Sequence, residues 1–350
     1  MMAEEWPIEP ASADQPRAPA RGAGDRLSTV RVDFFLDPAE RLTEQERALM
    51  TAMLHCLVGD IADEIRSALQ SGATAANDDG NIGLVETLSA ARLLDRPALV
   101  RLLLRRADEE RITAAAKARS GRREARVIQG LVSHEDGAVA AAAMSLILAR
   151  GRRRDRFGQC LLHFDDLPAA EAETLVQLIA AGLRRELGAG HAEADALLTA
   201  AGFQVTQRHD PDSGIEALTA RLVQLLDEIG GLTDDLIASA AMEGEMIFVG
   251  QTLSRRSAIR GDVALDELLS GDDVRVMALM RISGVRREVA ASLLAGVGDL
   301  LGIGDPGRAI AAFDRMSDAQ VEEARSWLGS DAAYRAAVAR LGMNHGQRPV

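Results

Sequence analysis

Aromatic residues are scarce in this chain: Phe, Tyr and Trp together make up 3% of its 350 residues. Sheet proteins draw on aromatic and β-branched side chains for their cores, so this composition argues against a β-sandwich or a β-barrel. Ala, Leu and Arg, which favour helices, are abundant instead. No stretch alternates strictly between polar and apolar residues, as a half-buried strand would. The sequence therefore predicts an all-α fold.

Cysteines and long hydrophobic runs are also scarce. Cys56 and Cys160 lie far apart in the sequence, which gives no disulfide framework and no metal-ligand spacing. The apolar stretch 138–149 is shorter than the ~18 residues of a membrane span, and it predicts a helix buried among other helices. The acidic N-terminus lacks the basic start of a signal peptide. We therefore expect a cytoplasmic protein without membrane insertion.

The formal net charge of -13 at pH 7 opposes long-range attraction to nucleic acid and to anionic lipid. Familiar catalytic patterns are missing as well: the sequence contains no His-Glu-x-x-His pair, no Gly-x-Ser-x-Gly elbow and no phosphate-binding Gly-x-x-x-x-Gly-Lys loop. The sequence predicts a protein that is not an enzyme, with no catalytic residues, cofactor or metal. An enzyme whose residues converge from distant helices stays open as an alternative.

The chain divides into four parts by composition. Residues 1–27 are rich in Pro and Ala without apolar periodicity, which predicts a disordered tail. Amphipathic segments, among them 97–107 and 108–119, then predict N-terminal HEAT-like repeats over 28–230 and a C-terminal helical region packed on the array over 231–342. Residues 343–350 predict a second disordered tail.

A weak internal repeat favours one helical architecture over others. In three places an apolar helix end is followed by an acidic turn and then by a helix that opens with a branched residue, namely Ile65, Val139 and Val274. Asp can cap the second helix while the branched residue anchors the core between the helices. The spacings are about two and three multiples of the roughly 40-residue HEAT period. We predict a HEAT-like α-solenoid of stacked antiparallel helix pairs; unrelated helix pairs with the same capping are the alternative.

Several phrases of the sequence resemble a known bacterial family. They are the Asp-x-x-x-Glu-Ile-Arg stretch at 60–66, the phrase at 93–99, the region from 245–248 to 283–285, and the closing residues Trp327, Leu328, Asp331, Tyr334 and Arg335. Together they resemble the HEAT-like proteins catalogued as domain of unknown function 2336, which is common in alphaproteobacteria. The resemblance implies a helical repeat fold over roughly 40–341. It carries no established activity and no functional residues.

Arginine clusters are the sequence feature that a fold alone does not require. Consecutive like charges in a loop repel one another, so 151–154 is the strongest candidate among them. If stacked helix pairs align the clusters, they form a basic groove that suits an acidic protein partner, a phosphorylated segment or nucleic acid. A solvated surface whose arginines pair with nearby Glu and Asp is the alternative. We therefore predict a non-catalytic scaffold or adaptor that binds another protein. The candidate partner-binding or anion-binding residues are Arg122, Arg123, Arg126, Arg152, Arg153, Arg154 and Arg156.

A nucleic-acid-associated helical-repeat protein is the alternative function. It would use the same arginine clusters together with the Gly-rich loop at 301–310, which is similar to the phosphate-binding hairpin of DNA-repair proteins. Asp305 places an anion where a phosphate would approach, and few aromatic residues are interleaved for base stacking. A plain helix-to-helix connection is therefore the favoured interpretation of that loop.

Overall fold

The computed structural model describes residues 43–69, 78–121, 126–187 and 191–341. These residues form α-helices and short 3-10 helices, with no strand among them and one isolated bridge between Arg154 and Cys160. The predicted all-α class is confirmed. The predicted tails, 1–27 and 343–350, lie outside the described residues.

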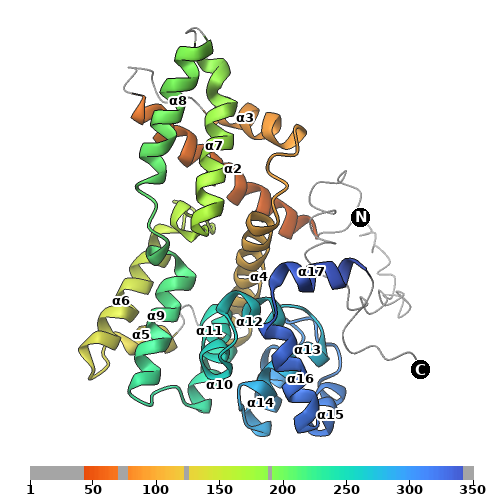
Figure 1. The fold of residues 1–350 in the computed structure, drawn as a ribbon. Helices are drawn as coiled ribbons and strands as arrows, with labels where there is room; N and C mark the ends of the chain where they lie inside the picture. The colour runs from red at the N-terminus through yellow and green to blue at the C-terminus, as the bar shows by residue number, and fades with distance from the viewer. Residues whose placement is uncertain (1–42, 70–77, 122–125, 188–190, 342–350) are drawn as a thin grey trace, which may run out of the picture.

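The helices pack around two hydrophobic clusters, which we call the upper and the lower lobe after their places in Figure 1. The cluster of the upper lobe contains Leu57 and Ile61 of one helix and Leu175 and Ile179 of another, all with side chains that are almost fully buried. Its helices are α2 (Glu44–Ala68), α3 (Asp78–Ala90), the first half of α4 (Pro97–Ser120), α7 (Ala169–Leu183), η2 (Arg184–Glu186) and α8 (His191–Thr206).

The lower lobe gathers the remaining helices around Phe248, Leu253 and Leu279, which are fully buried. Its first helices are α5 (Val127–Leu131), α6 (Gly137–Arg152), α9 (Ile215–Glu228), α10 (Asp234–Met242), α11 (Met246–Ser257) and α12 (Gly261–Leu268). They are followed by α13 (Asp273–Ile282), α14 (Arg287–Val297), α15 (Pro306–Arg315) and α16 (Asp318–Gly329), and α17 (Ala332–Arg340) is the last described helix. These clusters describe packing; the predicted division of the chain at residue 230 stays a prediction.

Helix α4 belongs to both lobes. Its Leu99 and Leu103 lie in the upper cluster and its Ile112 lies in the lower one. Proline at its first position has the fixed φ that a helix start needs, and Gly121 ends it with a φ of 61°, a conformation that favours glycine. The prediction of two separate helices here is wrong, because no glycine or proline interrupts the segment and side chains three residues apart pair along it.

The chain crosses between the lobes twice more. After α6 it returns to the upper lobe through η1 (Phe164–Asp166), and after α8 it descends through η3 (Pro211–Ser213) into α9. The crossings meet at one level, since the Asp166 side chain accepts a hydrogen bond from the Ile215 amide at 2.8 Å. This level, where α4 passes from one lobe to the other, is called the lobe junction below.

The three aligned repeat positions, Ile65, Val139 and Val274, differ in how deeply their side chains are buried. Ile65 and Val139 are fully buried, as predicted, but Val274 is 54% exposed. Asp136 and Asp272 cap their helices as predicted. The branched residue stands three positions after the first cap but two after the second, and one residue rotates a helical side chain by about 100°. Val274 therefore anchors no core.

The predicted turn near residue 60 is wrong, since α2 continues through it without interruption. The helix begins after Thr43, whose hydroxyl accepts a hydrogen bond from the Glu46 amide at 3.3 Å and caps it.

Candidate functional site

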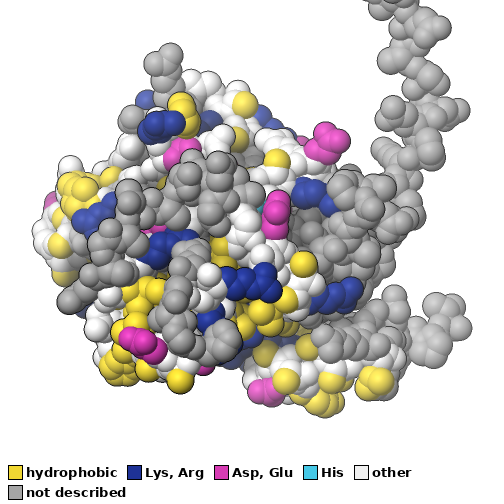
Figure 2. Space-filling model, turned by 90° about the horizontal axis from the view of Figure 1, so that it is seen from above, with side chains coloured by type: hydrophobic (Ala, Val, Ile, Leu, Met, Phe, Trp, Pro, Cys, Tyr) yellow, Lys and Arg dark blue, Asp and Glu magenta, His cyan; other side chains and the backbone are white. Residues whose placement is uncertain are grey.

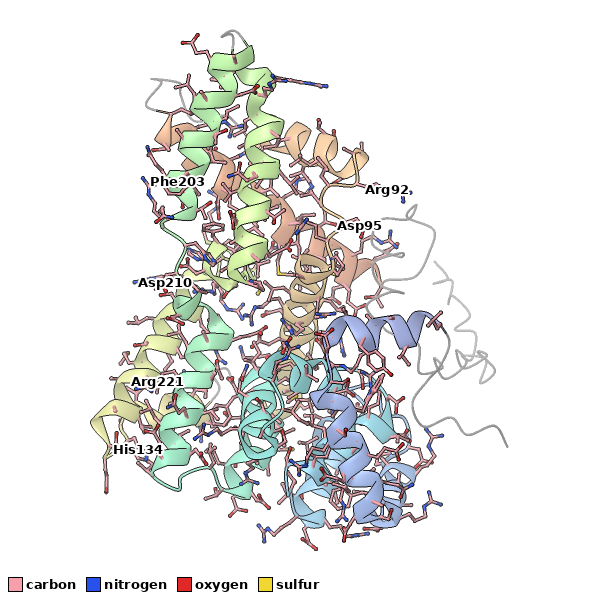
Figure 3. All side chains as sticks on the ribbon, viewed as in Figure 1. Arg92, Asp95, His134, Phe203, Asp210 and Arg221 are labelled. Carbon is pink, nitrogen blue, oxygen red and sulfur yellow. The ribbon has the colours of Figure 1, made fainter. Side chains whose placement is uncertain are left out.

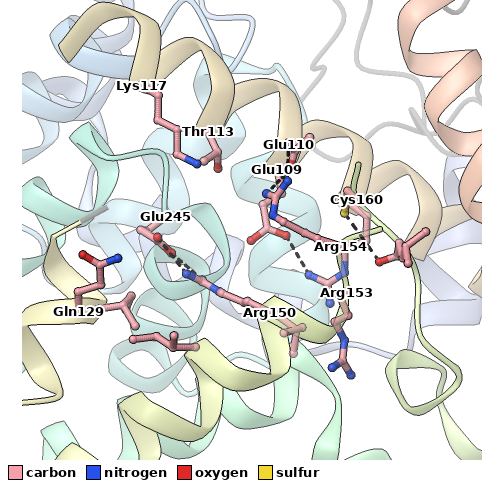
Figure 4. A pocket seen from close by; sticks show the side chains of 15 residues that line it. Glu109, Glu110, Thr113, Lys117, Gln129, Arg150, Arg153, Arg154, Cys160 and Glu245 are labelled. Carbon is pink, nitrogen blue, oxygen red and sulfur yellow. Dashed lines mark hydrogen bonds and ion pairs between the residues drawn. The ribbon is translucent and has the colours of Figure 1, made fainter. Parts of the chain in front are cut away.

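A cavity of about 230 Å³ opens at the lobe junction (Figure 4). Helix α4 contributes Arg106, Glu109, Thr113 and Lys117, which are spaced three or four residues apart and therefore share one side of the helix. The facing wall comes from α5, the end of α6, the segment after α6, the start of α9 and Glu245. The remaining lining residues are Glu110, Ile128, Gln129, Ile147, Arg150, Arg153, Arg154, Cys160, Leu161 and Ile215.

Arg153 and Asp166 form a buried ion pair behind this cavity. Arg153 Nε lies 2.9 and 3.1 Å from the two Asp166 carboxylate oxygens, and the side chains are 7% and 0% exposed. Asp166 also accepts hydrogen bonds from the amides of His163 and Ile215. Burial alone would raise the pKa of Asp166, but Arg106, Arg153 and the Ile215 amide outweigh burial and lower it. Arg153 thus holds three crossing segments together, because its Nη2 also donates to the Ser213 carbonyl.

Two further arginines tie the walls of the cavity to each other. Arg150 donates to both carboxylate oxygens of Glu245 at 3.0 and 2.6 Å, which joins α6 to the start of α11. Arg154 donates to both carboxylate oxygens of Glu110 at 3.2 and 2.8 Å, which joins the segment after α6 to α4. Paired guanidinium and carboxylate groups of this kind are directional as well as charged.

Arg106 is the most buried arginine side chain of the cavity, at 3% exposure. Its Nη1 donates to Glu109 at 2.9 Å, whereas its Nη2 lies 3.8 Å from the nearer Asp166 oxygen, which is too far for a hydrogen bond. Among the described residues, neither Nε nor Nη2 of Arg106 has a hydrogen-bond partner. Buried donors of this kind are rare in folded proteins.

Burial shifts two side chains of the cavity, the Glu109 carboxyl and the Cys160 thiol, toward their neutral forms. Burial raises the pKa of Glu109, against the attraction of Arg106. Burial also raises the pKa of the Cys160 thiol to about 12. Since the thiolate is the reactive form of cysteine, this cavity disfavours a cysteine nucleophile.

The arginines predicted to bind a partner differ in burial and in ion pairing. Arg153 is buried and Arg154 pairs with Glu110, so neither presents an unpaired charge to a partner. Arg152 and Arg156 are exposed, and neither forms an ion pair with another described residue; Arg156 stacks over the exposed Phe157 ring at 4.7 Å. Arg126 is exposed, and its amide donates to Glu243 at 2.7 Å. The two remaining candidates, Arg122 and Arg123, lie outside the described residues.

Arginines outside the candidate set also pair within the chain. Arg101 and Arg105 both contact Asp266, at 3.1 and 3.3 Å, and Arg119 pairs with Asp299. On the face shown in Figure 2, Lys and Arg side chains gather in patches with apolar side chains between them. Many of these arginines therefore join helices instead of forming a single ridge.

The outer face of α6 is a surface that the sequence did not predict. The sequence predicted a helix buried on all sides, but α6 lies at the edge of the lower lobe (Figure 1). Val139, Ala143 and Leu146 face the core, whereas Met144 and Leu148 are 42% and 56% exposed. The exposed positions of the helix are almost uncharged, and its basic residues lie in its last turn. An apolar helix without a polar face normally packs on all sides, and no pattern in the sequence marks which side is uncovered.

The Gly-rich loop connects α14 to α15. Gly302 has a φ of 84°, which favours glycine, and Leu301 and Ile303 are buried. The Asp305 side chain accepts a hydrogen bond from the Arg308 amide at 2.9 Å, so a carboxylate of the chain already occupies the start of α15.

In the part of the chain that the structure describes, no group of three or more His, Cys, Asp or Glu side chains is placed to hold a metal ion. No described helix is both long enough and apolar enough to cross a membrane.

These features define a two-lobed, all-helical protein whose lobes meet around an ion-paired polar cavity. The chain belongs to the family described as uncharacterised protein conserved in bacteria, domain of unknown function 2336 (DUF2336), whose model matches residues 88–328. The match runs from the end of α3 to α16 and so includes the whole lobe junction. The predicted resemblance is confirmed. No curated protein and no solved structure matches the chain.

Proposed function

We propose that this protein is a non-catalytic helical scaffold that binds a partner protein through the outer face of α6. The exposure of Met144 and Leu148 on an almost uncharged helix face is the observation that supports the proposal. Exposed apolar side chains that share one helix face are typical of a surface that receives another helix. A cytoplasmic location and an architecture of stacked antiparallel helix pairs are further parts of the same proposal.

Charge at one end of this face specifies the partner. Arg152 and Arg156 follow Leu148 in the chain and are exposed without an ion pair among the described residues. An amphipathic helix fits this surface when its apolar stripe lies along Met144 and Leu148 and its carboxylates lie at the end that meets the two arginines. The proposed partner is therefore an acidic amphipathic helix.

A photo-crosslinking amino acid placed at Leu148 tests the proposal in the bacterium that makes the protein. We expect crosslinks to a peptide that is amphipathic and helical with acidic residues at one end, and we expect them to disappear in a Met144→Glu variant. The matched control carries the crosslinker at Phe203, which is 61% exposed on α8 of the upper lobe (Figure 3). If both positions give the same products, or if the crosslinks survive Met144→Glu, the proposal is wrong.

Nucleic-acid association, the alternative function, receives less support. Arg153, Arg154 and Arg119 are paired with carboxylates of the chain, and Asp305 occupies the helix start in the Gly-rich loop. Duplex binding at low salt that is lost in an Arg152→Ala, Arg156→Ala double variant would favour the alternative over a protein partner.

A further inference from the structure

We infer that the turn at 155–158, called the Phe157 turn below, is a preformed anchor for the partner protein. The Phe157 ring enters an apolar pocket of the partner, and Arg156 pairs with a carboxylate at the rim of that pocket. The inference rests on the proposed function, because the turn follows α6 directly and shares Arg156 with the proposed surface. It adds a binding residue, Phe157, and a property of the partner, the pocket.

Phe157 has the largest exposed fraction, 75%, among the large apolar side chains of the described residues. Neither hydrophobic cluster contains it. Single exposed apolar side chains are ordinary on protein surfaces and by themselves indicate no function. Phe157 differs from such residues because the turn that carries it is firmly held.

Hydrogen bonds fix the backbone of the Phe157 turn. The Asp155 amide donates to the Gln159 carbonyl, and the Gly158 amide donates to the Asp155 carbonyl, both at 3.0 Å. The Asp155 carboxylate accepts hydrogen bonds from the amides of Phe157 and Gln159, each at 2.8 Å. Gly158 has a φ of 80°, a conformation that favours glycine. The turn therefore has a defined shape before any partner binds.

The base of the turn is fixed to the body of the protein. The Leu161 amide donates to the carbonyl of Arg153, whose side chain is buried. The Arg154 guanidinium donates to the Gly158 carbonyl at 2.6 Å and to both carboxylate oxygens of Glu110 on α4 (Figure 4). The Phe157 turn is thus braced against α4, the helix that joins the two lobes.

A braced turn with an exposed aromatic ring is suited to binding. Association with a partner normally costs free energy for ordering loops and side chains at the interface. A turn that is ordered in advance avoids much of this cost. Aromatic side chains that enter pockets are also over-represented among the residues that dominate binding energy. Phe157 combines the two properties, and its exposure means that it contributes little to the stability of the isolated chain.

Charge beside the ring specifies the pocket. The Arg156 guanidinium lies over the Phe157 ring, 4.7 Å from its centroid, and it forms no ion pair with another described residue. Because Arg156 covers one face of the ring, the other face and the ring edge are left for the pocket. A carboxylate at the rim would pair with Arg156. The partner is therefore a folded protein with an apolar pocket beside an acidic residue.

An anionic membrane is the alternative occupant, since an aromatic ring beside an arginine also suits the interface of a lipid bilayer. The formal net charge of -13 opposes attraction of the whole protein to such a surface. A protein pocket with a single carboxylate requires only local attraction, so we favour it over the membrane.

The photo-crosslinking amino acid p-benzoylphenylalanine, placed at Phe157 in the bacterium that makes the protein, tests the inference. We expect it to crosslink to the same partner as the crosslinker at Leu148, but to different residues, which are apolar and have Asp or Glu beside them. The matched control carries the same amino acid at Phe203, an exposed phenylalanine of the upper lobe. We expect no crosslink from Phe203 to that partner.

The outcomes separate this inference from the proposed function. Crosslinks from Leu148 without any from Phe157, or crosslinks from both to the same residues, leave the α6 surface in place and overturn the inference. Crosslinks from Phe157 to an apolar and acidic site without any from Leu148 support the anchor and contradict the α6 surface. Crosslinks from neither position overturn both proposals.

Vesicles of phosphatidylcholine and phosphatidylglycerol test the membrane. We expect the full chain not to sediment with them. Sedimentation with the vesicles that is lost in a Phe157→Ala variant, or crosslinks from Phe157 to lipid, would identify a membrane surface and overturn the inference.

Variants measure the contribution of the turn, with the yield of the Leu148 crosslink as the readout. We expect Phe157→Ala to lower binding at least about tenfold, as for an aromatic residue that dominates an interface, and Phe203→Ala to leave it unchanged. Asp155→Ala keeps Phe157 and Arg156 but removes the two side-chain hydrogen bonds of the turn, and we expect a loss of about threefold to tenfold. Asp155→Asn keeps an oxygen that accepts these bonds, so it should restore most of the yield.

Each result with the variants is decisive. An unchanged yield in Phe157→Ala would show that the ring makes no contact, and an unchanged yield in Asp155→Ala would show that the turn need not be preformed. Either result overturns the inference. Thermal unfolding followed by circular dichroism checks that the variants are folded, and we expect unchanged midpoints for Phe157→Ala and Phe203→Ala because both side chains are exposed.

Discussion

The lobe junction and the outer face of α6 are built by neighbouring residues, yet they differ in kind. Arg152 is exposed, Arg153 is buried against Asp166, and Arg154 pairs with Glu110 of α4. One turn earlier in the chain, Leu146 is fully buried while Leu148 is 56% exposed. Residues that are adjacent in sequence can therefore have different roles. The direction in which the backbone points each side chain decides whether it joins helices or remains exposed.

The largest effect is expected at the junction. Arg153→Ala leaves Asp166 buried without its hydrogen-bonded counter-charge, and loss of one partner of a buried ion pair costs about 3–5 kcal/mol of unfolding free energy. Arg152→Ala, one residue away and exposed, is expected to change stability by less than about 0.5 kcal/mol. Urea unfolding at pH 7, followed by circular dichroism, measures both. Similar losses in the two variants would remove the distinction between the junction and the outer face.

The two sides of α6 give the next largest contrast. Leu146→Ala creates a cavity in the lower core, and we expect a loss of about 3 kcal/mol. Leu148→Ala removes a side chain that is mainly in water, and we expect a loss below about 0.5 kcal/mol. Thermal unfolding of both variants checks the prediction. A large loss for Leu148→Ala in the isolated protein would mean that this side chain is covered.

Lowering the pH should reduce the difference in unfolding free energy between the wild-type protein and the Arg153→Ala variant. The pKa of Asp166 is lowered in the folded protein, so its charged form adds stability above the unfolded pKa near 4, and that contribution is lost as the pH falls through the folded pKa. In the Arg153→Ala variant the buried Asp166 carboxyl takes up a proton more readily, and protonation removes the cost of burying an unpaired charge. We expect the gap in unfolding free energy to shrink by about 1–2 kcal/mol between pH 7 and pH 3.5. Urea unfolding at several pH values measures the gap, and a constant gap would contradict the role given to Asp166.

The smallest effect concerns reactivity, because it leaves the fold unchanged. Cys160 lines the cavity and burial raises its pKa to about 12, whereas Cys56 is exposed on α2. We expect iodoacetamide at pH 8 to modify Cys56 at least about tenfold faster, since the thiolate is the reacting form. Mass spectrometry of digested samples gives both rates. Equal rates would show that the junction is more open than its ion pairs indicate.

Local features of the fold could be predicted and contacts at a distance could not. The caps at Thr43, Asp136 and Asp272 depend on residues two or three positions apart, and the structure contains all three. The core position of Val274 was predicted wrongly, because it depends on the register of a whole helix against its neighbours. Val276, two residues further along, is the buried valine.

The candidate site illustrates the same limit. An arginine-rich stretch after α6 is visible in the sequence, and it led to Arg152, Arg153 and Arg154 as one group. Their different burial and pairing depend on Glu110, which is 44 residues away from Arg154, and on Asp166, which η1 places at the lobe junction. The burial of Arg106 Nε and Nη2 without a hydrogen-bond partner among the described residues leaves no mark in the sequence, because it results from what the crossing segments place around them.

The sequence by itself determined the all-α class, the helix caps and the family to which the chain belongs, because propensity, capping and characteristic phrases are local properties of a chain. Only the tertiary structure decided that α4 joins two lobes, that Arg153 is buried while Arg152 is not, and that α6 keeps one face uncovered. These outcomes depend on side chains brought together from distant parts of the chain, where burial, charge pairing and unsatisfied donors arise together.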